Sequence, residues 1–176
     1  PSLTYETNFL GTLNLLEALR KFENKCVAVL ITSDKSYKNV EWTWGYRESD
    51  ELGGVDPYSA SKGATEILIN SYFKSYFTKD HPVSIGVGRA GNVIGGGDWA
   101  VDRIVPDCVV AWSKGDLVEL RNPYSTRPWQ HVLEPLSGYL NQAIALSQNK
   151  DLHGEPLNFG PQAQQNHSVL ELVEKM

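Results

Sequence analysis

Residues 26–37 read Cys-Val-Ala-Val-Leu-Ile-Thr-Ser-Asp-Lys-Ser-Tyr, and this stretch decides the fold that we predict. Apolar residues run without a break from Cys26 to Ile31, which is typical of a fully buried strand in a parallel sheet. Polar residues follow at once. Ligands of open α/β sheets bind beyond the carboxyl ends of the strands, so we expect a site there. The candidate site residues at this strand end are Ser33, Asp34 and Lys35.

The next informative stretch, residues 56–62, reads Asp-Pro-Tyr-Ser-Ala-Ser-Lys and predicts the start of a helix. Asp before the helix and Pro in its first turn are both favoured there. Tyr58 and Lys62 then lie four residues apart on one helical face. An ammonium group beside a phenol favours the phenolate, so Tyr58 is a candidate proton-transfer group. The alternative is a tyrosine and a lysine on a solvated helix face, and the pair alone does not decide between them.

Four short segments identify the kind of protein that this chain resembles. Together with the Tyr-x-x-x-Lys pair, they resemble the extended short-chain dehydrogenase/reductase family, and within it the nucleotide-sugar branch of the CDP-glucose 4,6-dehydratases. The resemblance covers nearly the whole chain, and the last two segments are its most specific part. The segments are Thr-Ser-Asp-Lys at 32–35, Glu-Trp-Thr-Trp-Gly-Tyr-Arg-Glu at 41–48, Asn-Val-Ile-Gly-Gly-Gly-Asp-Trp at 92–99 and Ser-Thr-Arg-Pro-Trp-Gln-His-Val at 125–132.

The resemblance implies an α/β fold in two parts. Residues 1–100 are expected to form the C-terminal part of a Rossmann-like, doubly wound parallel sheet that binds NAD. Residues 101–176 are expected to form most of a smaller α/β substrate-binding lobe, with a return to the sheet. The chain has no Gly-x-x-Gly-x-x-Gly, the turn that normally follows the first strand of a nicotinamide-binding unit. We therefore expect a fragment that does not bind NAD productively by itself.

The chemistry that the resemblance implies is the NAD-dependent dehydration of CDP-D-glucose to CDP-4-dehydro-6-deoxy-D-glucose. The sugar is oxidised at C4, loses water across C5 and C6, and receives the hydride back at C6, while the protein supplies proton transfer and orientation. Tyr58 would take the proton of the C4 hydroxyl, and Lys62 would assist it and hold the nicotinamide ribose. Ser33 would hydrogen-bond the same sugar oxygen. Asp34 would protonate the departing C6 hydroxyl.

The base that removes the C5 proton stays open. The dTDP-glucose dehydratases have Thr-Asp-Glu where this chain has Ser33, Asp34 and Lys35. Lys35 can be that base only if its ammonium gives up a proton, and it can instead stabilise the enolate as a cation. Two other readings also remain: a different nucleotide-sugar enzyme on the same scaffold, such as a 4-epimerase, a reductase or a dTDP- or GDP-sugar 4,6-dehydratase, and a non-catalytic relative.

Five more polar residues are candidate ligands by resemblance. Asn8 would help to hold its helix and a water near the active-site lysine, and Arg89 lies in the strand exit that passes the nicotinamide. Asn92 would touch the diphosphate of the nucleotide sugar. Arg127 is a candidate diphosphate clamp, because a guanidinium is planar, always charged and bidentate, and Arg103 is a second candidate. For Asn8 and Arg127, a simple surface position is the alternative.

Hydrophobic periodicity predicts the remaining elements. The aromatic loop between the first strand and the Tyr58 helix contains Trp42, Trp44 and Tyr46, which either cap the core or wall a sugar or base site, and we favour a lid over the substrate. By resemblance, the helices of Asn8 and Tyr58 would form a homodimer contact. The expected helices are 5–22, 57–77, an apolar helix to which residues 102–107 lead and which ends near 114–115, 132–147 and one starting at 168. The expected strands are 83–94, 117–120 and 157–160.

Bulk properties exclude several classes. The net charge of −5 argues against a nucleic-acid surface. The sequence has neither a signal peptide nor an apolar run of membrane-spanning length, which makes the cytoplasm the default location. Cys26 and Cys108 are expected to be reduced. His131 has no partner at metal-ligand spacing, so we predict a structural histidine and no metal.

Overall fold

The computed structural model describes residues 1–100 and 102–176 and divides into two compact units. The first unit contains Pro1–Ala90 and Leu136–Phe159, and the second contains Gly91–Pro135 and Gly160–Met176. Val101, where the second part was predicted to begin, lies outside the described residues.

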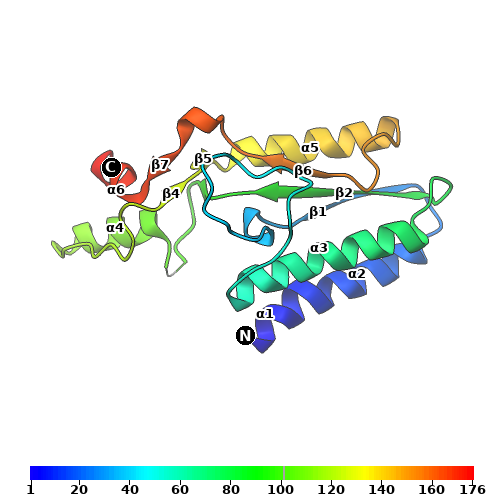
Figure 1. Ribbon diagram of the computed structural model, residues 1–176, viewed down its shortest axis with the longest axis horizontal. Coiled ribbons are helices and arrows are strands. Elements are labelled where there is room, and N and C mark those ends of the chain that lie inside the picture. The colour runs from blue at the N-terminus through cyan, green and yellow to red at the C-terminus, as the bar shows by residue number, and fades with distance from the viewer. Residues whose placement is uncertain (101) are drawn as a thin grey trace. The chain divides into compact units, whose positions relative to one another are not determined.

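The first unit is built on a parallel sheet of β1 (Cys26–Ile31), β2 (Val83–Ala90) and β6 (Pro156–Phe159), in the order β1-β2-β6 (Figure 1). The predicted strands at 26–31 and 157–160 are confirmed, the latter shifted by one residue. Cys26 pairs with Val83 and Ile31 with Gly88. Because β1 ends at Ile31, the polar residues of the candidate site follow directly at its carboxyl end.

The predicted burial of the first strand is wrong in one respect. In β1 only Leu30 is buried, and Ile31 is 46% exposed. Full burial is found instead in β2, where every residue except Ala90 is buried. The order of the strands explains this, because β2 lies between β1 and β6 whereas β1 has a strand on one side only within the described sheet.

Two helical segments pack together on one side of this sheet (Figure 1). The first runs through α1 (Ser2–Tyr5), the π-helical turn η1 (Glu6–Leu10) and α2 (Gly11–Arg20), and the second is α3 (Pro57–Tyr76). Both match the predicted helices at 5–22 and 57–77. Their apolar residues meet those of the strands in one core of Leu16, Leu30, Ile69, Phe77, Val83, Ile85 and Val87.

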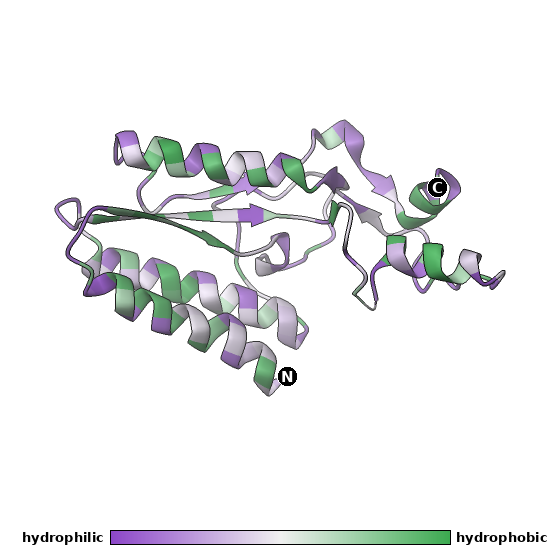
Figure 2. Cartoon of the chain, turned by 180° about the vertical axis from the view of Figure 1, so that it is seen from behind, coloured by the Kyte–Doolittle hydropathy of each residue, from purple (hydrophilic) through white to green (hydrophobic). Residues whose placement is uncertain are grey.

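Helix α5 (Leu133–Gln148) covers the other side of the sheet, and the view from behind shows the strands between the two helical layers (Figure 2). Glycines in β2 allow it to approach closely, because a Cβ at Gly88 would lie only 2.7 Å from the ring of Tyr139. The predicted apolar side of this helix is buried only in part. Leu146 is 3% exposed, whereas Leu140 is 68% exposed.

The second unit contains shorter elements. They are α4 (Ile104–Ser113), α6 (Val169–Glu174), the 3-10 turn η3 (Ala163–Gln165), a parallel pair of β3 (Val93–Ile94) with β5 (Gln130–His131), and an antiparallel pair of β4 (Thr126–Arg127) with β7 (His167–Ser168). The helix predicted to start at 168 is confirmed, and Ser168 and Glu171 form a capping box at its start. The predicted strand at 117–120 is wrong: that segment has no regular structure, and Leu117 is 97% exposed. The predicted strand at 83–94 is divided in two.

None of the described helices is both long and apolar enough to cross a membrane.

Candidate active site

The turn that follows β1 is stabilised by its own side chains. Ser33 precedes the 3-10 turn η2 (Asp34–Ser36), and its Oγ donates to Asp34 Oδ1 at 3.0 Å and accepts from the backbone N of Lys35 at 3.2 Å. The Oγ of Ser36 donates to the carbonyl of Ser33 at 2.7 Å. Ser33 is 9% exposed, Asp34 is half-buried and Lys35 is exposed. The turn therefore presents a hydroxyl, a carboxylate and an ammonium within three consecutive residues.

Asp56 caps the start of α3, as predicted. Its carboxylate accepts hydrogen bonds from the backbone N of Tyr58 and of Ser59 and from the Ser59 hydroxyl, the last at 2.6 Å. The Ser59 hydroxyl and these amides lower the pKa of Asp56, and the charge of Lys35 adds to the effect. The capped start fixes where the first helical turn places Tyr58.

Tyr58 and Lys62 lie next to each other on α3, as their spacing predicts. The Nζ of Lys62 is 5.9 Å from the centroid of the Tyr58 ring. Tyr58 is 47% exposed, whereas Lys62 is partly buried. Burial lowers the pKa of Lys62, and the charge of Glu66 opposes that shift. Within the described part of the chain, the Lys62 ammonium makes no hydrogen bond or ion pair, so its donors are available to a bound hydroxyl.

A glycine allows the turn of residues 33–36 to lie against this helix. A Cβ at Gly63 would lie 2.7 Å from the carbonyl O of Gly53 and 3.3 Å from that of Ser36. The backbone N of Gly53 also donates to the Ser36 carbonyl at 2.9 Å. The loop and the turn can therefore rest on α3 only because residue 63 has no side chain. Gly63 was not predicted as a site residue, although a glycine within a helix directly after Lys62 is a signal that the sequence contains.

Asn8 attaches the first helical segment to α3 at the level of the tyrosine–lysine pair. Its side-chain Nδ2 donates to Ser61 Oγ at 2.9 Å, and its main-chain carbonyl accepts from Thr65 Oγ1 at 3.0 Å. Asn8 lies within the π-helical turn η1, and such turns often occur at functional sites. The side chain therefore holds the two helices together between Tyr58 and Lys62.

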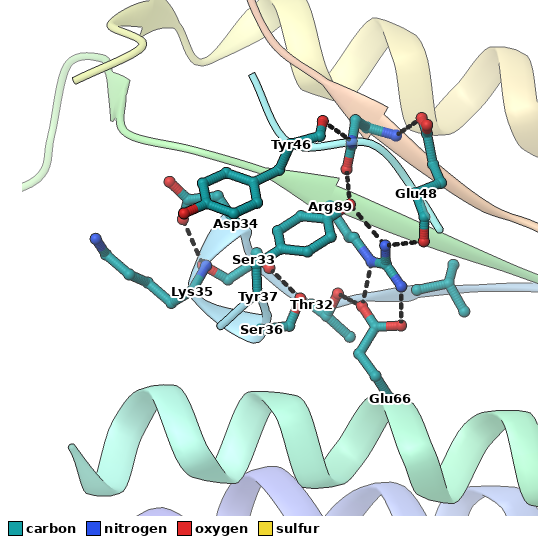
Figure 3. A network of polar contacts seen from close by, with 12 residues as sticks. Thr32, Ser33, Asp34, Lys35, Ser36, Tyr37, Tyr46, Glu48, Glu66 and Arg89 are labelled. Carbon is teal, nitrogen blue, oxygen red and sulfur yellow. Dashed lines mark hydrogen bonds and ion pairs between the residues drawn. The ribbon is translucent and has the colours of Figure 1, made fainter. Parts of the chain in front are cut away.

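Arg89 is bonded to other groups of the protein, and its predicted role in binding the cofactor stays a prediction. The guanidinium is turned into the protein and is 4% exposed (Figure 3). Its Nε and Nη2 donate to the two carboxylate oxygens of Glu66 at 2.7 and 2.9 Å, and its Nη1 donates to Tyr37 Oη at 2.6 Å and to the Glu48 carbonyl at 3.0 Å. The side chain is engaged in holding α3, β2 and the aromatic loop together.

The Glu66 carboxylate is the centre of this buried network and was missed in the sequence. It also accepts a hydrogen bond from the Thr32 hydroxyl at the end of β1. Burial works against the charge of Arg89, but the carboxylate of Glu66 and the Tyr37 hydroxyl more than offset it, so the pKa of Arg89 is raised. The readable signal was a glutamate four residues after Lys62, within a helix that packs on the sheet.

Four aromatic rings in and beside the aromatic loop pack one against the next in a row, and this row is called the ladder. Tyr37 stacks on Tyr46 with centroids 5.2 Å apart, Tyr46 lies 5.3 Å from Trp42, and Trp42 lies 5.5 Å from Trp44. Exposure increases along the ladder, because Tyr37 is 5% exposed and Trp44 is 61% exposed. The rings thus extend from the buried network to the surface, where a flat apolar face remains available.

The three predicted substrate-binding residues all lie in the second unit. Asn92 precedes β3, and its carbonyl accepts from the Gln130 backbone N at 3.2 Å. Arg127 lies in β4, is partly buried, and donates from Nη1 to the Thr126 carbonyl at 2.7 Å. Arg103 is exposed at the start of α4 and pairs with Asp98, with 3.7 Å between Nε and Oδ2. Their roles in binding remain predictions.

No group of three or more His, Cys, Asp or Glu in the described residues is arranged to hold a metal ion. The Nδ1 of His131 accepts from the backbone N of Leu133 at 3.2 Å, at the start of α5. Cys26 and Cys108 are free thiols.

The residues of the first unit fit one end of a dinucleotide. The half-buried Lys62 ammonium has free donors beside the exposed phenol of Tyr58, a chemistry suited to a ribose hydroxyl and a reacting oxygen. Gly86, Gly88 and Gly91 do show a Gly-x-Gly-x-x-Gly spacing. The first two lie inside β2 under α5, and the short strand β3 follows the third, so this spacing forms no phosphate-binding turn at a helix start.

A parallel α/β sheet, with a hydroxyl–carboxylate turn after one strand and a tyrosine–lysine pair on the next helix, defines a Rossmann-like chain of the short-chain dehydrogenase/reductase type. The family comparison then identifies its branch. A family model described as "GDP-mannose 4,6 dehydratase" matches residues 1–175, and the chain belongs to this family. The resemblance inferred from the motifs is confirmed.

Individual relatives point to the same branch. The CDP-glucose 4,6-dehydratase of Salmonella typhimurium is 48% identical over 180 residues, which cover 100% of this chain and 50% of that protein. The CDP-paratose 2-epimerase of Salmonella typhi is 27% identical, over 99% of this chain and 56% of that protein. The crystal structure of dTDP-glucose 4,6-dehydratase from Bacillus anthracis in complex with NAD matches with a TM-score of 0.80 and 28% identity, over 99% of this chain and 52% of that one. The chain thus spans about half the length of these relatives.

Proposed function

We propose that the protein dehydrates CDP-D-glucose to CDP-4-dehydro-6-deoxy-D-glucose. The observation that supports this most is the turn of Ser33, Asp34 and Lys35 resting on the helix of Tyr58 and Lys62, in a chain 48% identical to a CDP-glucose 4,6-dehydratase. A sugar 4-epimerase needs the tyrosine–lysine pair, but its reaction does not require a carboxyl group and an ammonium group at the strand end, such as those of Asp34 and Lys35. The turn therefore favours a 4,6-dehydratase over a 4-epimerase or a reductase.

Each group has a proposed task in this reaction. Tyr58 takes the proton of the C4 hydroxyl, and the Ser33 hydroxyl donates a hydrogen bond to the same oxygen. In this structure that hydroxyl donates to Asp34, so it must rotate to reach a sugar. Asp34 gives a proton to the departing C6 hydroxyl. Lys35 is either the base at C5 or a cation that stabilises the enolate, and its exposed position, which leaves the ammonium in contact with solvent, suits the second task better.

The proposed cofactor is NAD, which when bound would accept a hydride from C4 of the sugar and return it to C6. Lys62 would donate to its nicotinamide ribose. Asn8, which is anchored to Ser61, would hold the helices that position Lys62. We further propose that Asn92 and Arg127, with Arg103 as a second cation, bind the diphosphate of the nucleotide sugar. Two guanidinium groups and an amide that lie in one unit and are not buried suit that role.

We also propose that the protein forms a homodimer through the helices of Asn8 and Tyr58. Apolar side chains remain exposed on both helical segments: Leu3 is 73% exposed, Leu15 is 45% exposed and Ile67 is 60% exposed. Exposed apolar patches on paired helices are typical of a helical dimer interface. Light scattering of the full-length protein would test this. Leu15→Glu with Ile67→Glu should halve the molar mass, whereas Leu140→Glu on α5 should leave it unchanged.

The function is tested by incubating the full-length gene product with NAD⁺ and either CDP-glucose or dTDP-glucose. The 4-keto sugar product is followed by its absorbance in alkali. Product from CDP-glucose alone supports both the reaction and the nucleotide. An epimerised sugar without a keto product would refute the dehydratase proposal.

A further inference from the structure

We propose that Tyr37 is a positioning residue that fixes the aromatic loop of residues 38–55 to the catalytic turn. This inference rests on the proposed function only where it concerns the substrate. Tyr37 directly follows the turn of Ser33 to Ser36, and its backbone N donates to the Asp34 carbonyl at 3.3 Å. Its main chain also forms an isolated bridge with Leu52 at the far end of the loop. The residue thus belongs to the turn and to the loop.

The hydroxyl of Tyr37 both accepts and donates a hydrogen bond. It accepts a hydrogen bond from Arg89 Nη1 at 2.6 Å and donates one to Asn158 Oδ1 at 2.7 Å. The side chain is 5% exposed, and burial raises its pKa against the opposing hydrogen bond from Arg89. The hydroxyl therefore acts as a neutral donor and acceptor between a buried ion pair and a partly buried amide.

The ring of Tyr37 makes the second connection. The Cζ of Arg89 lies 4.8 Å from its centroid, and Tyr46 stacks on it with an interplanar angle of 19°. The Tyr37 ring thus contacts both Arg89 and Tyr46. Because the ion pair with Glu66 fixes Arg89, these ring contacts also fix the position of Tyr46 in the loop. The loop's outer rings, Trp42 and Trp44, are packed in turn on Tyr46 and on each other.

The same partners also hold the loop backbone. Asn158 Nδ2 donates to the Tyr46 carbonyl at 3.0 Å, and the Asn158 backbone N donates to Glu48 Oε1 at 2.9 Å. Arg89 Nη1 reaches the Glu48 carbonyl as well. All of these residues lie in the first unit, and Figure 3 shows the contacts converging around the Tyr37 ring and the guanidinium. The exposed aromatic faces of the loop therefore rest on a polar network whose centre, Tyr37 with Arg89 and Glu66, is buried.

This arrangement assigns Tyr37 a role in substrate binding that acts through the loop. A loop that only covered the core would not need exposed tryptophans on a buried ionic support, since such a support is costly to build. Tyr37→Phe keeps the stacking but leaves Asn158 Oδ1 without its donor and removes one acceptor of Arg89. The loop should then move more freely, and the wall that it forms should bind a nucleotide sugar less well.

Two readouts on the full-length protein test this. Tryptic cleavage after Lys38 or Arg47 reports loop opening, and steady-state kinetics with CDP-glucose report binding. For Tyr37→Phe we expect cleavage roughly 10-fold faster and a KM for CDP-glucose about 10-fold higher, with kcat within about 3-fold and an unchanged NAD affinity, because a lost buried hydrogen bond has about that effect. Asn158→Ala, which leaves the Arg89–Glu66 pair intact, should act in the same direction.

Tyr72→Phe is the matched control. It removes a hydrogen bond from a phenol to Glu17, at 2.9 Å, between α2 and α3. It should lower the melting temperature without changing loop cleavage or KM. If Tyr37→Phe and Asn158→Ala also change only the melting temperature, Tyr37 is a structural residue and the proposal is refuted. If the wild type forms no product from any nucleotide sugar, the proposed function fails, and the cleavage rates alone still decide whether Tyr37 holds the loop.

Discussion

Glu66 and Arg89 form a two-point ion pair between helix α3 and strand β2, in which Nε–Oε1 measures 2.7 Å and Nη2–Oε2 measures 2.9 Å. Only 4% of each side chain is exposed. Both charges have been removed from water, so each depends on the other for compensation. The pair also has Thr32 and Tyr37 as neighbours, one at each side of the catalytic turn.

This pair predicts a large loss of stability when one partner is neutralised. Glu66→Gln should lower the free energy of unfolding by about 3 kcal/mol or more, because it leaves the Arg89 charge buried without its counter-ion. Urea denaturation measures this. The control is Glu51→Gln, which breaks an exposed pair with Lys38 and should cost less than about 1 kcal/mol. Equal losses for the two variants would contradict the assigned role of the pair.

The tyrosine of the candidate pair should be required for turnover and dispensable for folding. Tyr58→Phe should lower kcat about 10²-fold or more, since it removes a proton-transfer group, and the melting temperature should barely change because the ring is 47% exposed. Tyr76→Phe is a matched control on the same helix, with a ring that is 48% exposed. It should retain normal activity. A Tyr58→Phe enzyme with normal kcat would remove Tyr58 from the reaction.

Lys62 is expected to lower the stability of the fold while it supports activity. Burial lowers its pKa, so the folded state holds the ammonium proton less tightly than the unfolded chain does. The cost of burying this charge is therefore fully present below the lowered pKa, and it is relieved as pH rises toward the ordinary lysine value of 10.5.

Lys62→Met should accordingly abolish most of the activity without lowering the free energy of unfolding at neutral pH. It should also remove that part of the rise in stability that the wild type shows in mildly alkaline solution. Denaturation curves between neutral and alkaline pH provide the measurement. Lys74→Met, at an exposed position in the last turn of the same helix, should leave both activity and the pH dependence unchanged. A clear loss of stability in Lys62→Met would contradict this account.

The stability that the Asp56 cap contributes should decrease in acid. Its pKa is lowered by the hydrogen bonds from Ser59 and Tyr58, so its contribution is present above the unfolded value near 3.8 and is lost as pH falls through the lowered folded pKa. Asp56→Ala should cost about 1 kcal/mol at neutral pH, the usual effect of losing an N-cap. The difference from wild type should shrink in strong acid. Asp80→Ala, at an exposed position, is the control.

The sequence predicted the local structure well wherever one residue pattern decides it. The unbroken apolar run gave strand β1, and the Asp-Pro pair gave the start of α3, because both depend on neighbours in the chain. The strand predicted at 117–120 failed because apolar residues form a strand only beside another strand, and within residues 1–100 and 102–176 no strand pairs with this segment. Pairing is a tertiary property that a short pattern does not contain.

The candidate site residues were proposed one by one from motifs, and their roles stay predictions, whereas the residues that hold them in place were not predicted. Ser33, Asp34, Tyr58 and Lys62 were readable because motif and strand end coincide. Arg89 looked like a ligand because it is a charge at the end of a strand. Its partner Glu66 lies 23 residues away in the sequence. Asn158, which bonds to the same Tyr37 hydroxyl as Arg89, lies still further along the chain. Long-range polar networks depend on which residues the fold brings together, and a single sequence does not reveal that.

The last prediction concerns the two charged residues of the catalytic turn, whose surroundings differ. Asp34 is half-buried and accepts from the Ser33 hydroxyl, whereas Lys35 is exposed. Asp34→Asn cannot protonate the leaving hydroxyl, so it should lower formation of the 4-keto-6-deoxy product about 10²-fold or more, whereas the oxidation at C4, which uses Tyr58, does not need this carboxyl group. If Lys35 is the C5 base, Lys35→Ala should stop deuterium exchange from solvent into C5. If it only stabilises charge, exchange should continue at a reduced rate, and Lys35→Arg should restore much of it because it keeps the cation. Lys38→Ala, an exposed lysine three residues on, should leave both readouts unchanged, and an effect there as large as that of Lys35→Ala would show that a general loss of positive charge is responsible.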